Sequence, residues 1–234
     1  MGFEVFKPEM GAGRRIEGIL FDMDGLVLDS EILYSRFWRE ACGHFGYTMS
    51  YEQSLRMRAV NNQLGQQRIQ GFFGPDADYW AIRSKRIELM DAFIEENGVA
   101  LKAGVRELLA FAKAQGIRTA ITSSSPLDRI RNHLGRHGLD TAFDALVSGK
   151  EVPHGKPAPD IFLRGAEVLG LQSEHCLALE DSPAGILAAH RAACLPVMVP
   201  DLEGPDTDTL PLLYAVADSL HDIIGLIEAQ NGHL

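Results

Sequence analysis

Strand-like and helix-like segments alternate regularly along the second half of the chain, and this alternation is the feature that most restricts its fold. The predicted helices cover residues 104–115, 126–137, 159–170 and 183–193, and the predicted strands cover residues 118–122, 145–148, 177–179 and 196–199. Local signals agree with these boundaries, because Pro126 and Pro183 stand near helix starts and Gly170 follows a periodic stretch. Regular alternation predicts a parallel sheet with helices on both faces, the Rossmann-like α/β class.

A separate strand is predicted far upstream. The apolar run 18–21 ends abruptly at Asp22-Met23-Asp24-Gly25, as a buried strand does when it meets a polar loop. From residue 30 to about residue 97 the pattern is helical and highly charged. A lone strand cannot form a domain, so we expect an α/β core made of residues 1–29 and 100–234. The all-helical segment 30–99 is then an insert in that core and a candidate cap domain.

Composition and charge narrow the classes of partner. With 46% hydrophobic residues among 234, the chain can bury a full core. Its formal net charge of -10 repels nucleic acid and anionic lipid, so neither nucleic acid nor a membrane is an expected partner. An acidic protein still binds an anionic small molecule where a metal ion, a lysine and backbone N–H groups reverse the charge locally. We therefore expect a pocket of this kind. The chain is also expected to be a monomer.

The cysteines bear on the compartment. Cys42, Cys176 and Cys194 are odd in number and show no CxxC spacing, which predicts neither a disulfide framework nor a zinc site. A reducing cytoplasm is therefore the expected location. Neither an export signal nor a membrane span is predicted, because no apolar stretch precedes Arg14 and Arg15 and no long apolar run occurs. The glycine-rich residues 10–13 are predicted to form a loose leader.

The pair Asp22 and Asp24 is distinguished by its position rather than by its spacing. The same DxD spacing recurs at residues 76–78 and 206–208, where charged, solvated loops explain it. The first pair follows an apolar strand and precedes a glycine, at the carboxyl end where open α/β sheets bind their ligands. We therefore expect Asp22 and Asp24 to take part in chemistry.

Three more polar groups follow predicted strands. Ser123 and Ser124 begin a serine run before a helix, where hydroxyl and N–H groups suit a phosphate oxygen, although an ordinary helix N-cap explains them too. Lys156 lies in a proline-rich loop and is either a fixed positive charge for phosphate or a plain solvated lysine. The adjacent Glu180 and Asp181 would repel a phosphate unless a cation lay between them. Hard carboxylate oxygens, with no cysteine or histidine nearby, predict magnesium.

Together these groups form a pattern that no single residue shows. Its parts are the DxDG of residues 22–25, Ser123 after a strand, the lysine of GKPxPDxF, and the EDSPAG of residues 180–185. In this order they resemble the four motifs of the haloacid dehalogenase-like phosphatases, and the match spans nearly the whole chain. The helical insert resembles the cap of the branch that contains β-phosphoglucomutase and small sugar-phosphate phosphatases.

This resemblance implies a phosphatase that hydrolyses a small phosphorylated metabolite, of the sugar-phosphate or nucleoside-phosphate class, through an aspartyl-phosphate intermediate. It implies that Asp22 is the nucleophile and that Asp24 is the general acid and base. The phosphate-binding residues would be Ser123, Ser124 and Lys156. The residues that would hold Mg²⁺ are Asp22, Asp24 through its carbonyl, Asp181 and, close by or through water, Glu180.

Other activities of the same family stay open. A phosphosugar mutase of the β-phosphoglucomutase type is the main alternative, but those enzymes carry a histidine where this chain has Tyr34, which favours hydrolysis. Dehalogenation is disfavoured because the dehalogenases of the family lack the second acid of the first motif, which is Asp24 in this chain. A non-catalytic binding protein is disfavoured because all four motifs are intact.

The substrate is not specified by the motifs. A likeness to pseudouridine-5′-phosphatase-like members is local, covering residues 154–163 and 197–201. Sugar phosphates, phosphoglycolate, glycerol phosphate and nucleoside monophosphates all remain possible. Each of the candidate substrate contacts in the insert is better explained as a solvated surface side chain than as a ligand. They are Arg58, Asn61, Arg83, Lys85 and Arg86.

Overall fold

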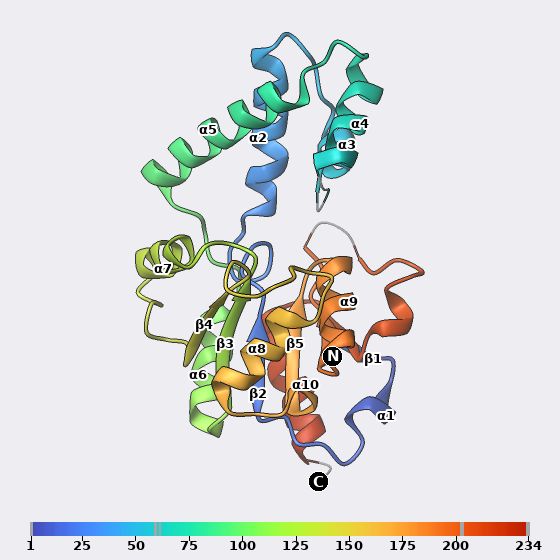
Figure 1. The fold of residues 1–234 in the computed structure, drawn as a ribbon. Coiled ribbons are helices and arrows are strands. Elements are labelled where there is room, and N and C mark those ends of the chain that lie inside the picture. The colour runs from blue at the N-terminus through green and yellow to red at the C-terminus, as the bar shows by residue number, and fades with distance from the viewer. Residues whose placement is uncertain (1, 59, 61, 202–203, 233–234) are drawn as a thin grey trace. The chain divides into compact units, whose positions relative to one another are not determined.

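The computed structural model describes residues 2–58, 60, 62–201 and 204–232 (Figure 1). The chain divides into two compact units. The first joins Met1–Leu28 to Leu101–Leu234, and the second is Asp29–Ala100. Strands and helices alternate in the first unit, whereas the elements described in the second unit are all helices.

The first unit is built on a seven-stranded sheet with the order β1-β7-β6-β5-β2-β3-β4. Its strands are β1 (Phe3–Val5), β2 (Gly18–Phe21), β3 (Arg118–Ser123), β4 (Ala145–Ser148), β5 (Cys176–Glu180), β6 (Leu195–Met198) and β7 (Ala215–Ala217). Neighbours from β7 across to β4 run parallel, and β1 pairs antiparallel with β7. The predicted α/β class with a Rossmann-like parallel sheet is confirmed, with one antiparallel strand added at its edge.

Helices cover both faces of this sheet. The helices described in this unit are α1 (Pro8–Gly11), α6 (Val105–Gln115), α7 (Leu127–Arg136), α8 (Asp160–Leu169), α9 (Pro183–Arg191) and α10 (Leu220–Gly232), with short 3-10 turns at Ser173–His175 and Leu210–Leu212. Leu20 of β2 and Ala178 of β5 share a buried cluster with α8 and α9. Successive strand residues face opposite sides, so Ile19 and Leu179, which are also fully buried, face the other layer. On that layer α6 and α10 pack against each other.

The prediction of a loose leader at residues 10–13 is wrong. β1 extends the sheet, and α1 follows it with Gly11 buried. The Nε2 group of Gln230, on α10, donates to the carbonyl of Gly11 at 2.5 Å and to that of Arg14 at 2.7 Å. A three-residue strand is too short to show the alternation on which a strand prediction depends. β7 and α10 are two further elements without a sequence prediction.

The second unit consists of helices α2 (Glu31–His44), α3 (Tyr51–Leu55), α4 (Asn62–Phe73) and α5 (Tyr79–Asn97). α2 packs along α5, and Trp38 stacks on Tyr79 with ring centroids 6.1 Å apart inside a buried apolar cluster. Asp78 is the N-cap of α5, because its Oδ1 accepts from the backbone N–H groups of Trp80 and Ala81. One of the recurring DxD pairs therefore contains a helix cap.

Some candidate substrate contacts in the insert have partners within this unit. Arg58 donates from Nε to Glu31 Oε2 at 2.6 Å. The guanidinium of Arg86 lies over the ring of Tyr34, 4.9 Å from its centroid. Asn61 lies outside the described residues. Arg58 and Arg86 thus both have roles in holding the helical unit together.

No helix in the described part of the chain is both long and apolar enough to cross a bilayer. Cys42, Cys176 and Cys194 are free and buried. Burial raises the pKa of the Cys42 and Cys176 thiols to about 12, which keeps them protonated and unreactive at neutral pH. The three thiols are therefore packing residues rather than nucleophiles.

Candidate active site

The predicted site residues of the first unit gather at the carboxyl ends of β2, β3 and β5. After β2 the chain builds β3 and β4 on one side and then returns to place β5 on the other side. Such a change of direction leaves a crevice beyond the strand ends, where open α/β sheets bind ligands. The register pairs Phe21 with both Ile121 and Leu179, so the next residues, Asp22 and Glu180, emerge at the same level.

A tight loop fixes the two aspartates that follow β2. The backbone N–H of Asp22 donates to Leu179 O at 3.0 Å, which continues the sheet one residue past the strand. Gly25 has φ of 85°, a conformation that side chains disfavour, and its N–H donates to Leu28 O at 2.9 Å. A β-bridge also joins Asp24 to Leu28. The DxDG sequence is thus a turn that holds Asp22 and Asp24 at the strand end.

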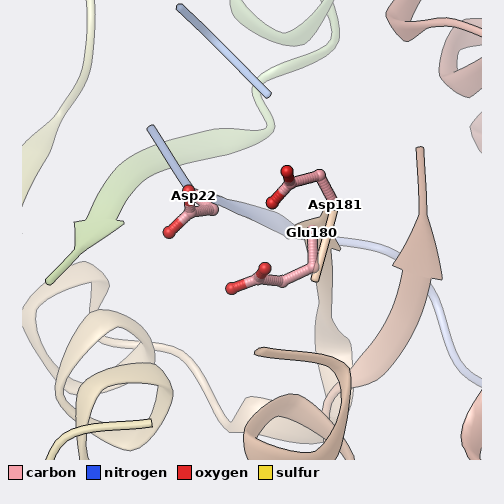
Figure 2. Close-up of side chains that lie close together, drawn as sticks. All are labelled: Asp22, Glu180 and Asp181. Carbon is pink, nitrogen blue, oxygen red and sulfur yellow. The ribbon is translucent and has the colours of Figure 1, made fainter. Parts of the chain in front are cut away.

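Three buried carboxylates form a cluster at this edge (Figure 2). Asp22, Glu180 and Asp181 are 8%, 1% and 6% exposed, and one oxygen from each lies within 4.8 Å of the others. Burial raises the pKa of Asp22 to about 7, with Lys156 opposing the rise and Glu180 adding to it. The main cause is burial, because a carboxylate removed from water loses the solvation that stabilises its charge.

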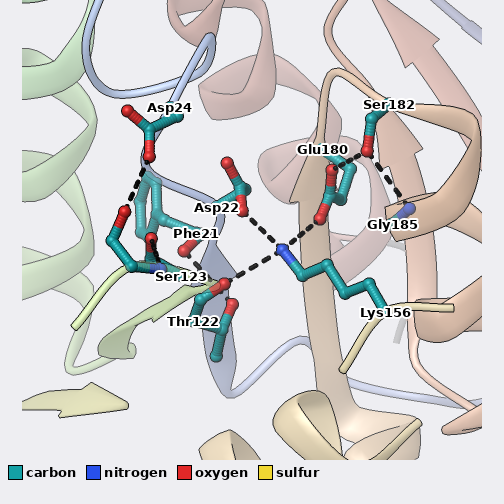
Figure 3. A network of polar contacts seen from close by, with 10 residues as sticks. Phe21, Asp22, Asp24, Thr122, Ser123, Lys156, Glu180, Ser182 and Gly185 are labelled. Atoms are coloured by element: carbon teal, nitrogen blue, oxygen red, sulfur yellow. Dashed lines mark hydrogen bonds and ion pairs between the residues drawn. The ribbon is translucent and has the colours of Figure 1, made fainter. Parts of the chain in front are cut away.

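Lys156 reaches this cluster from the loop before α8. Its Nζ donates to Asp22 Oδ1, to Glu180 Oε1 at 2.5 Å and to the carbonyl of Thr122 at 3.0 Å (Figure 3). These acceptors match the three N–H donors of an ammonium group. Burial lowers the pKa of Lys156, but the two carboxylates outweigh burial and hold it above its ordinary value. The lysine is therefore a fixed positive charge rather than a solvated side chain.

Glu180 is held on its other oxygen by the start of α9. Ser182 is the N-cap of α9, and its hydroxyl donates to Glu180 Oε2 at 3.0 Å while accepting from the N–H of Gly185 at 3.1 Å. Both oxygens of Glu180 therefore have protein partners, Lys156 and Ser182. Figure 3 shows this carboxylate lying between them.

Gly185 lets the Glu180 carboxylate lie against the first turn of α9. A Cβ at Gly185 would come within 1.9 Å of Glu180 Cδ. Gly185→Ala is therefore expected to displace the carboxylate, destabilise the fold by about 1–3 kcal/mol and lower kcat/KM by about tenfold to a hundredfold. Thermal unfolding and steady-state kinetics measure the two effects. The matched control is Gly135→Ala on α7, where a Cβ meets nothing within 4 Å; equal behaviour of the two variants would contradict the expectation.

The three serines at the end of β3, residues 123–125, differ in burial and in their contacts. Ser123 is buried, and its Oγ accepts from the backbone N–H of Ser125 at 3.1 Å, which leaves its own proton for donation. Ser124 is exposed. Ser125 donates from Oγ to Asp24 Oδ2 at 3.2 Å. The structure therefore joins the serine run to the loop after β2.

Several residues of the site carry no sequence prediction of their own. They are the carbonyl of Thr122, Ser148, Ser182 and Gly185, whereas Ser125 is predicted only as the last residue of the serine run 123–125. Ser182 and Gly185 lie inside the EDSPAG motif, so the motif points to them without showing their contacts. Ser148 ends a strand, and the rule that sites lie at carboxyl ends of parallel strands is the signal that points to it.

The donor set of the cluster fits a hard divalent cation. All the side-chain ligands are carboxylate oxygens, the type that magnesium prefers. When they are ionised, the three carboxylates and the Lys156 ammonium leave two negative charges, which one divalent cation would cancel. The residues present therefore fit Mg²⁺.

Comparison with known proteins gives consistent matches. The family model described as haloacid dehalogenase-like hydrolase matches residues 16–193. The chain is 32% identical over 225 residues to hexitol phosphatase B of Escherichia coli K12, covering 92% of this chain and 97% of that protein. It is 31% identical over 180 residues to fructose-1-phosphate phosphatase YqaB of the same organism, covering 76% and 93%. The crystal structure of CbbY from Rhodobacter sphaeroides in complex with phosphate is similar, with a TM-score of 0.67, 26% identity, and coverage of 89% and 96%.

Proposed function

The chain belongs to the haloacid dehalogenase-like hydrolases, and we propose that it is a magnesium-dependent phosphatase of phosphorylated sugars or hexitols that works through an aspartyl-phosphate on Asp22. The family and the named phosphatases that it matches make it a phosphoric monoester hydrolase. The observation that carries the proposal is the buried cluster of Asp22, Glu180 and Asp181 with Lys156 at the carboxyl edge of the sheet.

The proposed reaction has two displacements at phosphorus. A carboxylate oxygen of Asp22 bonds to phosphorus while the bond to the sugar oxygen breaks, and that oxygen takes a proton from Asp24. Water then attacks the aspartyl-phosphate, giving its proton to Asp24, and the bond between phosphorus and Asp22 breaks. Inorganic phosphate leaves, and Asp22 and Asp24 return to their starting states.

Lys156 and Ser123 are proposed to bind the phosphoryl oxygens. The N–H groups of Lys156 already have acceptors, one of which is Asp22 Oδ1. As an Asp22 oxygen bonds to phosphorus, its negative charge passes to the leaving sugar oxygen, which takes the proton of Asp24. The Asp22 carboxyl then accepts hydrogen bonds less strongly, so the Lys156 donor that it held can turn to a phosphoryl oxygen. Ser123 contributes a hydroxyl whose oxygen already accepts from Ser125. Ser124 is exposed and follows Ser123 in the same turn, and it is proposed to bind a phosphoryl oxygen as well.

Mg²⁺ is proposed to be held by the Asp22 carboxylate, the Asp24 carbonyl and Asp181. Glu180 lies beside them and, with both oxygens engaged, mainly holds Lys156. The chemistry that a bound magnesium ion supplies in such a site is neutralisation of charge on the transferring phosphoryl group.

The helical unit Asp29–Ala100 is proposed to act as the cap that selects the leaving group, as in the sugar-phosphate branch of the family. We keep the predictions of a monomer and of a cytoplasmic location; buried thiols without disulfides suit a reducing compartment.

The function is tested by phosphate release from a panel of phosphorylated hexitols and ketohexoses, with fructose 1-phosphate included, in the presence of Mg²⁺. Release from members of this panel, well above release from nucleoside monophosphates and phosphoglycolate, is the expected result. A mutase would instead isomerise a hexose phosphate without releasing phosphate. Absence of release from the whole panel would contradict the proposal.

Magnesium binding is expected to weaken as the pH falls below about 7. The pKa of Asp22 in the metal-free protein is about 7, so below that pH the metal must displace a proton from a carboxyl that is mostly neutral. The affinity should fall by about tenfold per pH unit below the pKa and be nearly constant above it. Calorimetric Mg²⁺ titrations between pH 5.5 and 8 measure this. Asp22→Asn should lose most of the dependence, and a parent affinity that is flat across the range would contradict it.

A further inference from the structure

The Asp24 carboxyl is held by a serine that the family motifs do not mark. Ser125 lies in the turn between β3 and α7, and its hydroxyl donates to Asp24 Oδ2 at 3.2 Å. The two residues are far apart in the chain but belong to the same compact unit. The contact therefore depends on how the ends of β2 and β3 are placed by the sheet.

The position of Ser125 is itself determined by hydrogen bonds on both sides of its backbone. Its N–H donates to Ser123 Oγ at 3.1 Å. Its carbonyl accepts from the hydroxyl of Ser148 at 2.7 Å. The backbone that carries the Ser125 side chain is thus held between the end of β3 and the end of β4.

Ser148 is the fully buried last residue of β4. Its single hydroxyl proton goes to Ser125 O, and its oxygen accepts from the N–H of Lys150 at 3.1 Å, so the direction of the hydroxyl is fixed. The next residue, Gly149, donates its N–H to Ser123 O at 2.7 Å. A Cβ at Gly149 would come within 3.0 Å of Ser124 Cα. The turns after β3 and β4 therefore pack too closely to move independently.

The hydrogen bond from Ser125 restricts the carboxyl of Asp24. Rotation about the last bond of an aspartate side chain in solution is only weakly restricted, and a donor on one oxygen limits it. Because the Ser125 proton occupies a lone pair of Oδ2, the proton that Asp24 transfers is favoured on Oδ1. The orientation of the acid is then defined before substrate binds.

We infer that Ser125 is a positioning residue that orients the general acid Asp24, and that Ser148 supports Ser125 in this role. The inference rests on the proposed function, because it needs Asp24 to protonate the leaving alcohol. Ser125 touches neither reacting atom in this scheme and acts through Asp24.

The test compares leaving groups, because a misplaced acid matters only when the leaving group needs a proton. For Ser125→Ala, kcat/KM for an alkyl phosphate such as fructose 1-phosphate is expected to fall by about tenfold to a hundredfold. For p-nitrophenyl phosphate, whose leaving group departs as a stable anion, the expected fall is less than about threefold. Ser125→Thr, which keeps the hydroxyl, should recover most of the alkyl phosphate activity.

Ser148→Ala is expected to show the same selectivity with a smaller fall. In the double variant of Ser125 and Ser148 the losses should not multiply, because Ser148 acts through Ser125. Ser173→Ala, at the opposite end of β5, is the control for a serine removed from the same unit. Equal falls for alkyl and aryl phosphates in Ser125→Ala would show a merely structural role, and unchanged kinetics would show none; either result overturns the inference. Failure of the proposed function is a separate result, since the parent protein would then hydrolyse neither substrate.

Discussion

Asp22→Asn is expected to lower kcat by on the order of 10⁴-fold or more for every phosphate ester. The amide keeps the shape of the carboxyl but is not a nucleophile, so no aspartyl-phosphate forms. The loss should be the same for alkyl and aryl substrates, because bond formation to phosphorus fails whatever the leaving group. Parent and variant assayed together for phosphate release measure the effect and reveal any contaminating phosphatase. Acid quenching followed by mass spectrometry should find a phosphorylated peptide containing Asp22 in the parent but not in the variant.

The same variant is expected to fold at least as well as the parent when metal is removed. The pKa of Asp22 is raised from 3.8 to about 7 in the folded protein, so ionisation costs folding stability as the pH rises through this window. Above pH 7 the full cost is present, and the asparagine avoids it. At pH 8 in chelator, the Tm of Asp22→Asn should equal or exceed that of the parent. If the variant were both inactive and strongly destabilised, loss of the fold would explain the lost activity. Residual activity above about 1% of the parent would contradict Asp22 as the nucleophile.

Much of the α/β core follows from patterns that are local in the sequence. β2 and β4 have the predicted bounds, because each is a short apolar run with polar residues on both sides. The parallel class places the residues after β2, β3 and β5 at one edge. This is why Asp22, Ser123 and Glu180 could be grouped from the sequence before their contacts were known.

The remaining features depend on tertiary contacts that no local pattern carries. β1 and β7 have three residues each, and each is stabilised by pairing with the other end of the chain. Asp206 shows why spacing alone misleads, since its Oδ1 accepts from the N–H of Thr209 and so it stabilises a turn. Similarly, the sequence does not reveal that Lys156 and Ser182 engage the two oxygens of Glu180.

Asp24→Asn is expected to separate the two halves of the reaction. The amide cannot give a proton to the leaving alcohol, so kcat/KM for alkyl phosphates should fall by about 10³-fold. It cannot take a proton from water either, so the aspartyl-phosphate, once formed, should hydrolyse slowly. With p-nitrophenyl phosphate, whose leaving group needs no proton, the first step should proceed and the second should stall. The phosphorylated Asp22 peptide should therefore accumulate in this variant.

Rapid-quench measurement with p-nitrophenyl phosphate tests this directly. The expected result is a burst of p-nitrophenol close to one equivalent per active site, followed by slow turnover, with phosphorylated protein recovered during the slow phase. Asp22→Asn is the matched control and should show neither burst nor label. The amide oxygen that Asp24→Asn introduces can still accept from the Ser125 hydroxyl, so a large change in the local fold is not expected, and unchanged thermal unfolding should confirm this. A variant that loses alkyl and aryl activity equally and accumulates no intermediate would assign the proton transfers to a residue other than Asp24, while leaving the role of Asp22 intact.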